Sequence, residues 1–146
     1  MSYSNILIAI DGSSCSMNAL EKGIELAKAL SANVMLLSVV DMTTMIDTAG
    51  VGAVMDTNAE KIFQEEAQKL LKRAMKKYPY AKMTPITEEG IPKEAINPIA
   101  EKHHADLIVM GTHGRTGLEH FFMGSVAEQV IRHAKIPVMV VNSSED

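Results

Sequence analysis

Glycines and small polar residues follow an apolar run in the last third of the chain, in a pattern suited to binding phosphate. The apolar run covers residues 106–110, and glycine then occurs three times within residues 111–117. Gly124 and Ser125 follow, directly before a segment with helical spacing. Glycine lets the backbone approach a ligand closely, and a helix N-terminus presents unpaired N–H groups and a partial positive charge. The pattern predicts a phosphate-binding loop between a buried strand and a helix.

Polar side chains in and near this loop are the candidates for ligand contacts. His113 and Arg115 lie between the glycines, where an arginine fork suits phosphate oxygens, and the sequence leaves open whether each faces ligand or solvent. Ser125 suits the N-cap of the following helix, which would direct its hydroxyl to the helix and leave backbone N–H groups for phosphate. Asp11 stands beside Gly12 after another apolar run and suits a ribose hydroxyl or a hydrated Mg²⁺.

Several signatures of catalysis are missing from the sequence. It has no Gly-x4-Gly-Lys-Ser/Thr loop, no Gly-x-Ser-x-Gly elbow and no His-x-Gly-His motif. The glycine loop also lacks the lysine and the metal-binding pair that brisk phosphoryl transfer requires. The histidines, carboxylates and Cys15 show no zinc-like spacing. We therefore expect binding rather than efficient catalysis.

The elements that must position these residues form an alternating series. Short continuous apolar runs are typical of strands buried on both faces. Such strands are expected at residues 6–10, 34–40, 82–88, 107–110 and 136–141. Four segments with apolar residues every three or four positions separate them. The fold class is therefore α/β, a doubly wound parallel sheet of five strands with helices on both faces.

Two prolines refine this interpretation. Pro85 confines the third strand to an edge of the sheet, and Pro98 is expected to kink the third helix or break it in two. In doubly wound sheets ligands bind beyond the carboxyl ends of the strands, where the strand order reverses. If the first strand neighbours the fourth, Asp11 and the glycine loop line one crevice.

Length and composition describe one ordinary globular domain, residues 1–146. Of these residues 47% are hydrophobic and 22% charged, close to the globular average. The net charge of −4 and the pI near 5.7 argue against nucleic-acid partners and an anionic membrane surface. Residues 42–56 lack a sustained period and are expected to form a long mobile loop, and residues 142–146 a frayed tail.

The cellular compartment is inferred from the cysteine content and the N-terminal residues. Cys15 is the only cysteine, which fits a reducing compartment, and we expect it to pack in the interior. No secretory signal pattern opens the chain, and no apolar run approaches the length of a membrane span. These features favour the cytoplasm.

The glycine motif also carries a family resemblance. The spacing Gly111-x2-Gly114-x9-Gly124-Ser125 resembles the nucleotide-binding signature of the universal stress proteins. Residues 8–13 resemble the opening strand and loop of that family, and the resemblance runs essentially from end to end.

The resemblance implies the sheet order 3-2-1-4-5, a homodimer formed through the last strand at Val138–Val141, and membership of the branch that binds ATP, with Mg²⁺. It places Asp11 near the ribose and phosphates, Val39 and Val40 beside the adenine, and the glycine-loop backbone on the phosphates. The binding residues implied are Ala9, Ile10, Asp11, Val39, Val40, Met110, Gly111, His113, Gly114, Arg115, Gly124, Ser125 and Val126.

The function expected from these observations is an ATP-dependent stress-response switch. Nucleotide occupancy would order residues 42–55 and the glycine loop and change the surface offered to an unidentified protein partner. One alternative is a slow ATPase in which Asp11 or His113 positions water. Another is a nucleotide-free module that forms dimers through residues 137–141. A different adenine nucleotide, including a cyclic or dinucleotide messenger, is a further possibility.

Overall fold

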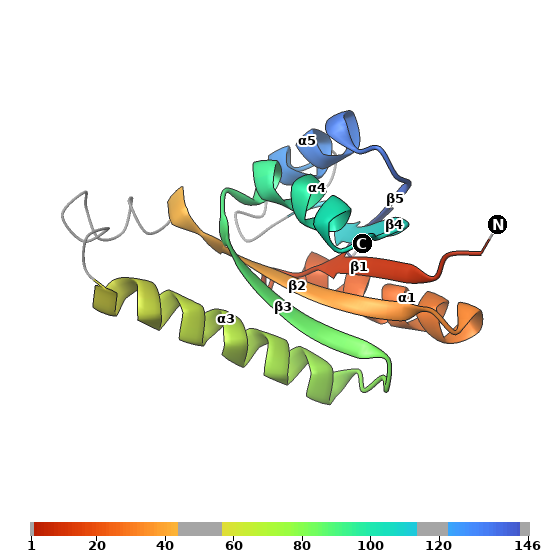
Figure 1. Cartoon of the computed structure of the whole chain (residues 1–146), viewed down its shortest axis with the longest axis horizontal. Helices are drawn as coiled ribbons and strands as arrows, with labels where there is room; N and C mark the ends of the chain where they lie inside the picture. The colour runs from red at the N-terminus through yellow and green to blue at the C-terminus, as the bar shows by residue number, and fades with distance from the viewer. Residues whose placement is uncertain (1, 44–56, 114–122, 144–146) are drawn as a thin grey trace.

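The predicted strands form one parallel sheet in the order β3-β2-β1-β4-β5, as the computed structural model shows (Figure 1). The structure describes residues 2–43, 57–113 and 123–143. The elements are β1 (Asn5–Ala9), α1 (Ser14–Leu30), β2 (Asn33–Asp41), α3 (Thr57–Lys77), β3 (Met83–Gly90), α4 (Pro92–Lys102), β4 (Leu107–Gly111), α5 (Ser125–His133) and β5 (Val138–Val141). The fold class and the strand order expected from the sequence are therefore confirmed.

The strand order reverses between β1 and β4. β1 pairs with β2 on one side and with β4 on the other, so the connections run outward in both directions from this point. β3 lies at an edge of the sheet, as Pro85 predicts, with Pro85 opposite Leu36 of β2. The crevice that a doubly wound sheet offers to ligands is thus located at the carboxyl ends of β1 and β4.

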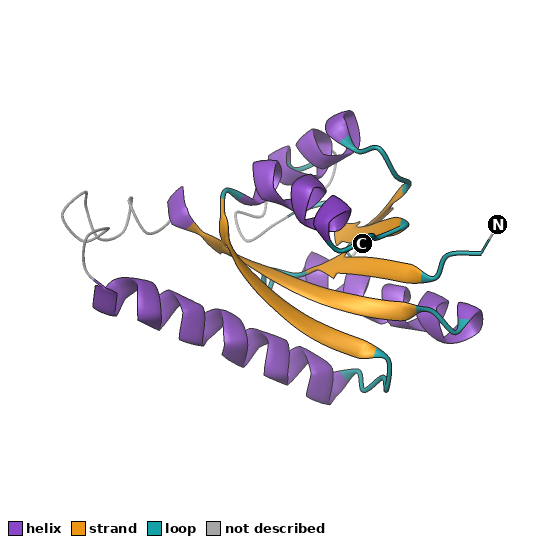
Figure 2. Cartoon of the chain, viewed as in Figure 1, coloured by secondary structure: helices purple, strands orange, loops and turns teal. Residues whose placement is uncertain are grey.

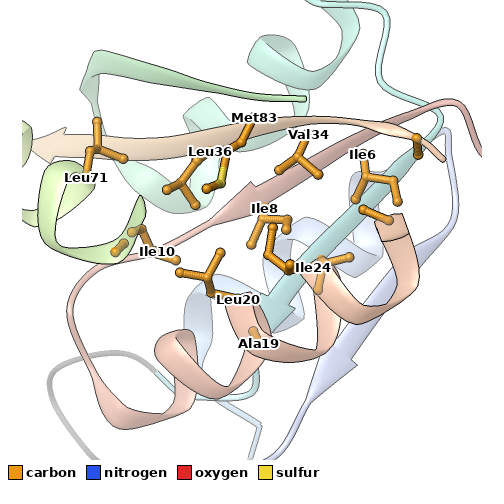
Figure 3. Close-up of a cluster of buried hydrophobic side chains, with 14 of the residues drawn as sticks. Ile6, Ile8, Ile10, Ala19, Leu20, Ile24, Val34, Leu36, Leu71 and Met83 are labelled. Carbon is orange, nitrogen blue, oxygen red and sulfur yellow. The ribbon is translucent and has the colours of Figure 1, made fainter. Parts of the chain in front are cut away.

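Helices α1 and α3 cover one face of the sheet, and α4 and α5 cover the other (Figure 2). Alternate residues of β1 enter the two layers: Ile6 and Ile8 belong to the core with α1 and α3, and Leu7 to the core with α4 and α5. Figure 3 shows Ile8 close to Leu20 and Ile24 of α1. Burial on both faces explains why the strands read as continuous apolar runs.

Pro98 does not break the third predicted helix in two. α4 runs from Pro92 to Lys102 with Pro98 inside it, and Pro92 occupies its first turn as the sequence predicts. A proline removes one backbone hydrogen bond. The buried side chains of Ile96 and Ile99 on either side of Pro98 anchor the helix to the sheet, which offsets that loss.

The predicted loop and tail lie mostly outside the described residues. Met42 and Thr43 are helical, and the N–H of Thr43 donates to Asp41 Oδ1 at 2.9 Å, so the first residues of the predicted loop are ordered by the end of β2. At the other end, the carbonyl of Asn142 accepts a 2.5 Å hydrogen bond from Asn18 Nδ2. No helix in the described part of the chain is long and apolar enough to cross a membrane.

Candidate functional site

A cavity of about 290 Å³ lies at the carboxyl ends of β1, β2 and β4, near the lower end of the range usual for small-molecule sites. Its walls contain every predicted binding residue that the structure describes. These are Ala9, Ile10, Asp11, Val39, Val40, Met110, Gly111, His113, Gly124, Ser125 and Val126. Gly114 and Arg115 lie outside the described residues. Residues from distant parts of the sequence thus meet at the point where the strand order reverses.

The turn between β1 and α1 fixes Asp11 at the cavity. Gly12 has φ of +86°, a conformation that favours glycine. The N–H of Ser13 donates to Asp11 Oδ1 at 2.9 Å, and the N–H of Asp11 donates to Ser16 Oγ at 3.2 Å. Ser13 is the N-cap of α1, where its Oγ accepts from the N–H of Ser16 at 3.2 Å. The carboxyl of Asp11 is therefore held by the turn that starts the helix.

Main-chain hydrogen bonds place the N-terminus of α5 beside the end of β4. The N–H of Thr112 donates to the carbonyl of Val141 at 3.1 Å, and the N–H of Gly124 donates to the carbonyl of Thr112 at 2.7 Å. The N–H groups of the first helical turn have no acceptor within the helix. Gly124, Ser125 and Val126 line the cavity, so this end of α5 offers donors and a partial positive charge at the site.

The prediction that Ser125 caps α5, with Glu128 reaching back to complete a capping box, is wrong. Gly124 is the N-cap, and no side chain caps the helix. Ser125 is the first helical residue, so its hydroxyl does not perform the capping role expected from the sequence. Glu128 accepts a 2.7 Å hydrogen bond from Arg132 instead of reaching back to the cap. The extended conformation of Gly124 already suits an N-cap.

Gly111 has a packing role that the sequence did not reveal. A Cβ at this position would lie 2.9 Å from the carbonyl carbon of Cys15 and 3.0 Å from its Cβ. Backbone atoms of α1 therefore occupy the space that any side chain at position 111 would need. The first glycine of the motif permits close contact between β4 and α1, whatever it does for a ligand.

Two side chains of the cavity wall, Thr112 and His113, form a hydrogen-bonded row with Cys15 behind them. Cys15 is 3% exposed, as the expected interior position requires, and its Sγ lies 3.2 Å from Thr112 Oγ1. Thr112 Oγ1 lies 3.0 Å from Nδ1 of His113. Ser13 Oγ also donates to the carbonyl of His113 at 3.5 Å. The ring and the backbone of His113 are thus both tied to the β1–α1 side of the site.

The cavity extends over both faces of the sheet at the end of β2. Val39 packs with the layer of α4 and α5, and Val40 packs with Phe63 and Ala67 of α3. Sequence reasoning missed much of this wall. The lining residues that it missed are Ser16, Leu37, Ser38, Asp41, Phe63, Glu66, Ala67, Leu70, Pro92, Ile96, Thr112 and Ala127. Two of these residues could have been recognised from the sequence: Asp41 is an acid at a strand end, like Asp11, and Thr112 lies inside the glycine motif. No sequence pattern indicated the residues of α3.

The charged groups on the described part of the wall are all acidic. Asp11, Asp41 and Glu66 contribute carboxylates, and no lysine or arginine among the described residues lines the cavity. The favourable electrostatics for an anion come from the N-terminus of α5. A polyanionic ligand would therefore need a cation to offset the carboxylates.

A second cavity, of about 370 Å³, lies between α4 and the segment that leads into β5. Its lining includes Asn97, His104 and Ile136, and an ion pair of 3.1 Å joins Lys135 to Glu101 beside it. This cavity is at the amino ends of β4 and β5, opposite the end where doubly wound sheets bind ligands. It contains none of the predicted site residues.

Comparisons with known proteins match this chain to one family and its fold. The universal stress protein family model matches residues 2–142. A universal stress protein of Methanocaldococcus jannaschii is 40% identical over 141 residues, which cover 95% of this chain and 82% of that protein. Among solved structures, the hypothetical protein MJ0577 superposes with a TM-score of 0.86 at 30% identity, over 100% of both chains.

Two structures of the same fold contain adenine nucleotides. A universal stress protein in complex with cAMP has a TM-score of 0.67 at 23% identity and covers 99% of this chain and 100% of its own. The universal stress protein of Archaeoglobus fulgidus in complex with dAMP has a TM-score of 0.59 at 22% identity, over 97% and 99%. At these identities the likeness concerns the fold. From the family match and the M. jannaschii relative, this chain belongs to the universal stress protein family.

Proposed function

We propose that the chain binds ATP, with Mg²⁺, in the cavity at the carboxyl ends of β1, β2 and β4. The observation that carries the proposal is that the N-terminus of α5, the fixed carboxyl of Asp11 and the apolar end of β2 line one cavity. These three features match the three parts of a nucleotide: phosphate, ribose and base. The cAMP and dAMP complexes of two proteins with this fold support an adenine nucleotide as the ligand class.

Each part of ATP has an assigned position in the proposal. The phosphates lie at the N–H groups and hydroxyl at the start of α5, by Ser125 and Val126, because unpaired helix donors bind anions. The ribose hydroxyls donate to Asp11. The adenine packs against Val39 and Val40. Gly114 and Arg115 are assigned to the phosphates on the sequence motif alone.

Magnesium fits the charge of the site. Asp11, Asp41 and Glu66 would repel a free triphosphate, and Mg²⁺ bound to the phosphates reduces that repulsion. The described residues contain no cluster of three side chains able to hold a metal ion, so the metal would be held mainly by the phosphates and water, with Asp11 as the candidate protein ligand.

The proposed output is nucleotide occupancy rather than turnover. If ATP binds one conformation of the chain better than another, it shifts the population toward that conformation. A protein partner in the cytoplasm would then bind the altered surface during the stress response. We also propose a homodimer through Val138–Val141. β5 is an edge strand whose four residues are only half-buried, and an unpaired edge suits association.

The first experiment identifies the ligand. Freshly purified protein is denatured, and the released small molecules are analysed by mass spectrometry. Calorimetric titrations with ATP and Mg²⁺ then compare the wild type with Val126→Phe, which fills the cavity, and with Ile131→Phe, a control on the exposed side of the same helix. We expect bound ATP, a loss of affinity of at least about tenfold for Val126→Phe, and wild-type affinity for Ile131→Phe.

Other outcomes would replace the proposal. Tighter binding of cAMP or dAMP in parallel titrations would keep the adenine site and change the nucleotide. Phosphate release that tracks protein concentration, and stops in an Asp11→Ala variant that still binds ATP, would favour the slow ATPase. No released ligand and no binding at millimolar ATP would favour the nucleotide-free dimer module.

A further inference from the structure

One ring nitrogen of His113 has a partner and the other has none. Nδ1 lies 3.0 Å from Thr112 Oγ1. Nε2 is buried and has no hydrogen-bond partner within the described part of the chain, although His113 is on the cavity wall. A buried polar atom without a partner costs free energy. A ligand that supplied the missing partner would therefore gain from it.

The hydroxyl of Thr112, which contacts Nδ1, is in turn contacted by the buried thiol of Cys15. Thr112 is 8% exposed and Cys15 is 3% exposed, and Cys15 Sγ lies 3.2 Å from Thr112 Oγ1. The thiol has a second acceptor in the carbonyl of Val141, at the longer distance of 3.7 Å. That carbonyl already accepts the N–H of Thr112 at 3.1 Å. The nearer hydroxyl is thus the better acceptor for the thiol proton.

Which group donates each hydrogen bond in this row determines which ring nitrogen of His113 carries the proton. If the thiol donates to Thr112 Oγ1, the hydroxyl is left to donate to Nδ1, and a neutral ring carries its proton on Nε2. The opposite tautomer requires the thiol to donate to Val141 and Thr112 to donate to the sulfur, so that Thr112 Oγ1 accepts from Nδ1–H and Nε2 presents a lone pair. The distances favour the first arrangement.

We propose that Thr112, backed by the thiol of Cys15, is a positioning residue that keeps His113 as the Nε2–H tautomer, ready to donate to a phosphate oxygen of the bound nucleotide. The inference rests on the proposed function, because it assigns a donor within the same site. The contact requires a phosphate oxygen to lie next to Nε2, which is buried in the nucleotide-free chain. A lone pair at Nε2 would instead repel the phosphate.

The tautomer can be measured without any nucleotide. The two nitrogens of a neutral imidazole have different ¹⁵N chemical shifts, so NMR of ¹⁵N-histidine-labelled protein at about pH 8.5, where neutral imidazole dominates, reports which one carries the proton. His113→Gln identifies the signal. We expect the Nε2–H form in the wild type and in Thr112→Ser, and a mixture in Thr112→Val, which keeps the shape and removes the hydroxyl. The Nδ1–H form in the wild type would overturn the proposal.

Binding separates the positioning role from a merely structural one. In calorimetric titrations with Mg²⁺, Thr112→Val should lose about tenfold or more in affinity for ATP and little for adenosine, which has no phosphate, while Thr112→Ser should remain close to the wild type. Equal losses for ATP and adenosine would overturn the proposal. If the wild type binds no ATP, both the proposed function and the phosphate contact are overturned. The spectrum of the nucleotide-free protein tests the tautomer of His113 independently of ATP binding.

Discussion

The N–H of Gly124 donates a 2.7 Å hydrogen bond to the carbonyl of Thr112, so the two ends of the glycine-rich segment are joined by their main chains. A second main-chain bond, from Thr112 to Val141, extends the connection to β5. These main-chain hydrogen bonds hold the N-terminus of α5 at the cavity. This arrangement separates the stability of the site from its affinity for a ligand.

Gly111→Ala should destabilise the fold. The added Cβ would lie 2.9 Å from a backbone atom of Cys15, which cannot move without shifting α1 from the sheet. We expect a loss of about 1–3 kcal/mol in the free energy of unfolding, as for other overpacked cores, measured by urea denaturation.

Gly23→Ala is the matched control for this substitution. Its new Cβ would lie 2.5 Å from Cδ1 and 3.1 Å from Cγ1 of Ile8, and the end of a side chain shifts at lower cost than backbone atoms. Alanine also favours the helix by about 1 kcal/mol over glycine. Gly23→Ala should therefore cost clearly less than Gly111→Ala, and the reverse order would contradict the packing role of Gly111.

Ser125→Ala should leave stability almost unchanged and weaken nucleotide binding. Since Gly124 is the N-cap, the substitution should change the free energy of unfolding by less than about 0.5 kcal/mol. Ser13→Ala removes a true capping oxygen, which accepts from the N–H of Ser16, and should cost about 1 kcal/mol. Urea denaturation of both variants and an ATP titration of Ser125→Ala test this, and equal losses of stability would restore the capping role for Ser125.

Removal of Mg²⁺ should weaken ATP binding strongly. Asp11, Asp41 and Glu66 line the cavity, so the uncompensated triphosphate meets carboxylates. In EDTA we expect the affinity for ATP to fall by about tenfold or more, which corresponds to about 1.4 kcal/mol of binding free energy. The affinity for adenosine should not change with the chelator. ATP affinity that is independent of Mg²⁺ would show that the phosphates lie away from these carboxylates.

Glu60 should give the stability a distinct pH dependence. A hydrogen bond with Glu89 and the charge of that carboxylate raise the pKa of Glu60 above its ordinary value of 4.5. The folded state therefore holds the proton more tightly than the unfolded state, and this contribution to stability is lost as pH rises from about 4.5 through the raised pKa. Urea midpoints between about pH 4 and 7 should show this decline in the wild type relative to Glu60→Gln, and parallel curves would contradict it.

The fold was predictable because its signals are local. Continuous apolar runs such as residues 34–40 indicate strands buried on both faces, and Pro85 indicates the edge position that β3 occupies. Of the two outcomes predicted for Pro98, a kink or a break, the break is wrong, because Ile96 and Ile99 hold α4 on the sheet across the proline.

The lining of the cavity was predictable only at strand ends and at the start of α5. Asp11 and the glycine motif lie at strand ends, and topology brings such positions together. Phe63 and Glu66 line the same cavity from α3, but their approach depends on how a long helix packs across β2, which no local pattern encodes. The cap at Gly124 was misassigned because serine is the commoner capping residue in sequences.

The contact between Gly111 and Cys15 affects how relatives should be classified. In this chain the close spacing of β4 and α1 demands a glycine at the first motif position, whether or not a nucleotide binds. A glycine at this position is therefore, by itself, weak evidence for ligand binding. Annotation of nucleotide-binding members would rest more safely on positions without such a packing role, such as Ser125, whose side chain the fold leaves uncommitted to helix capping.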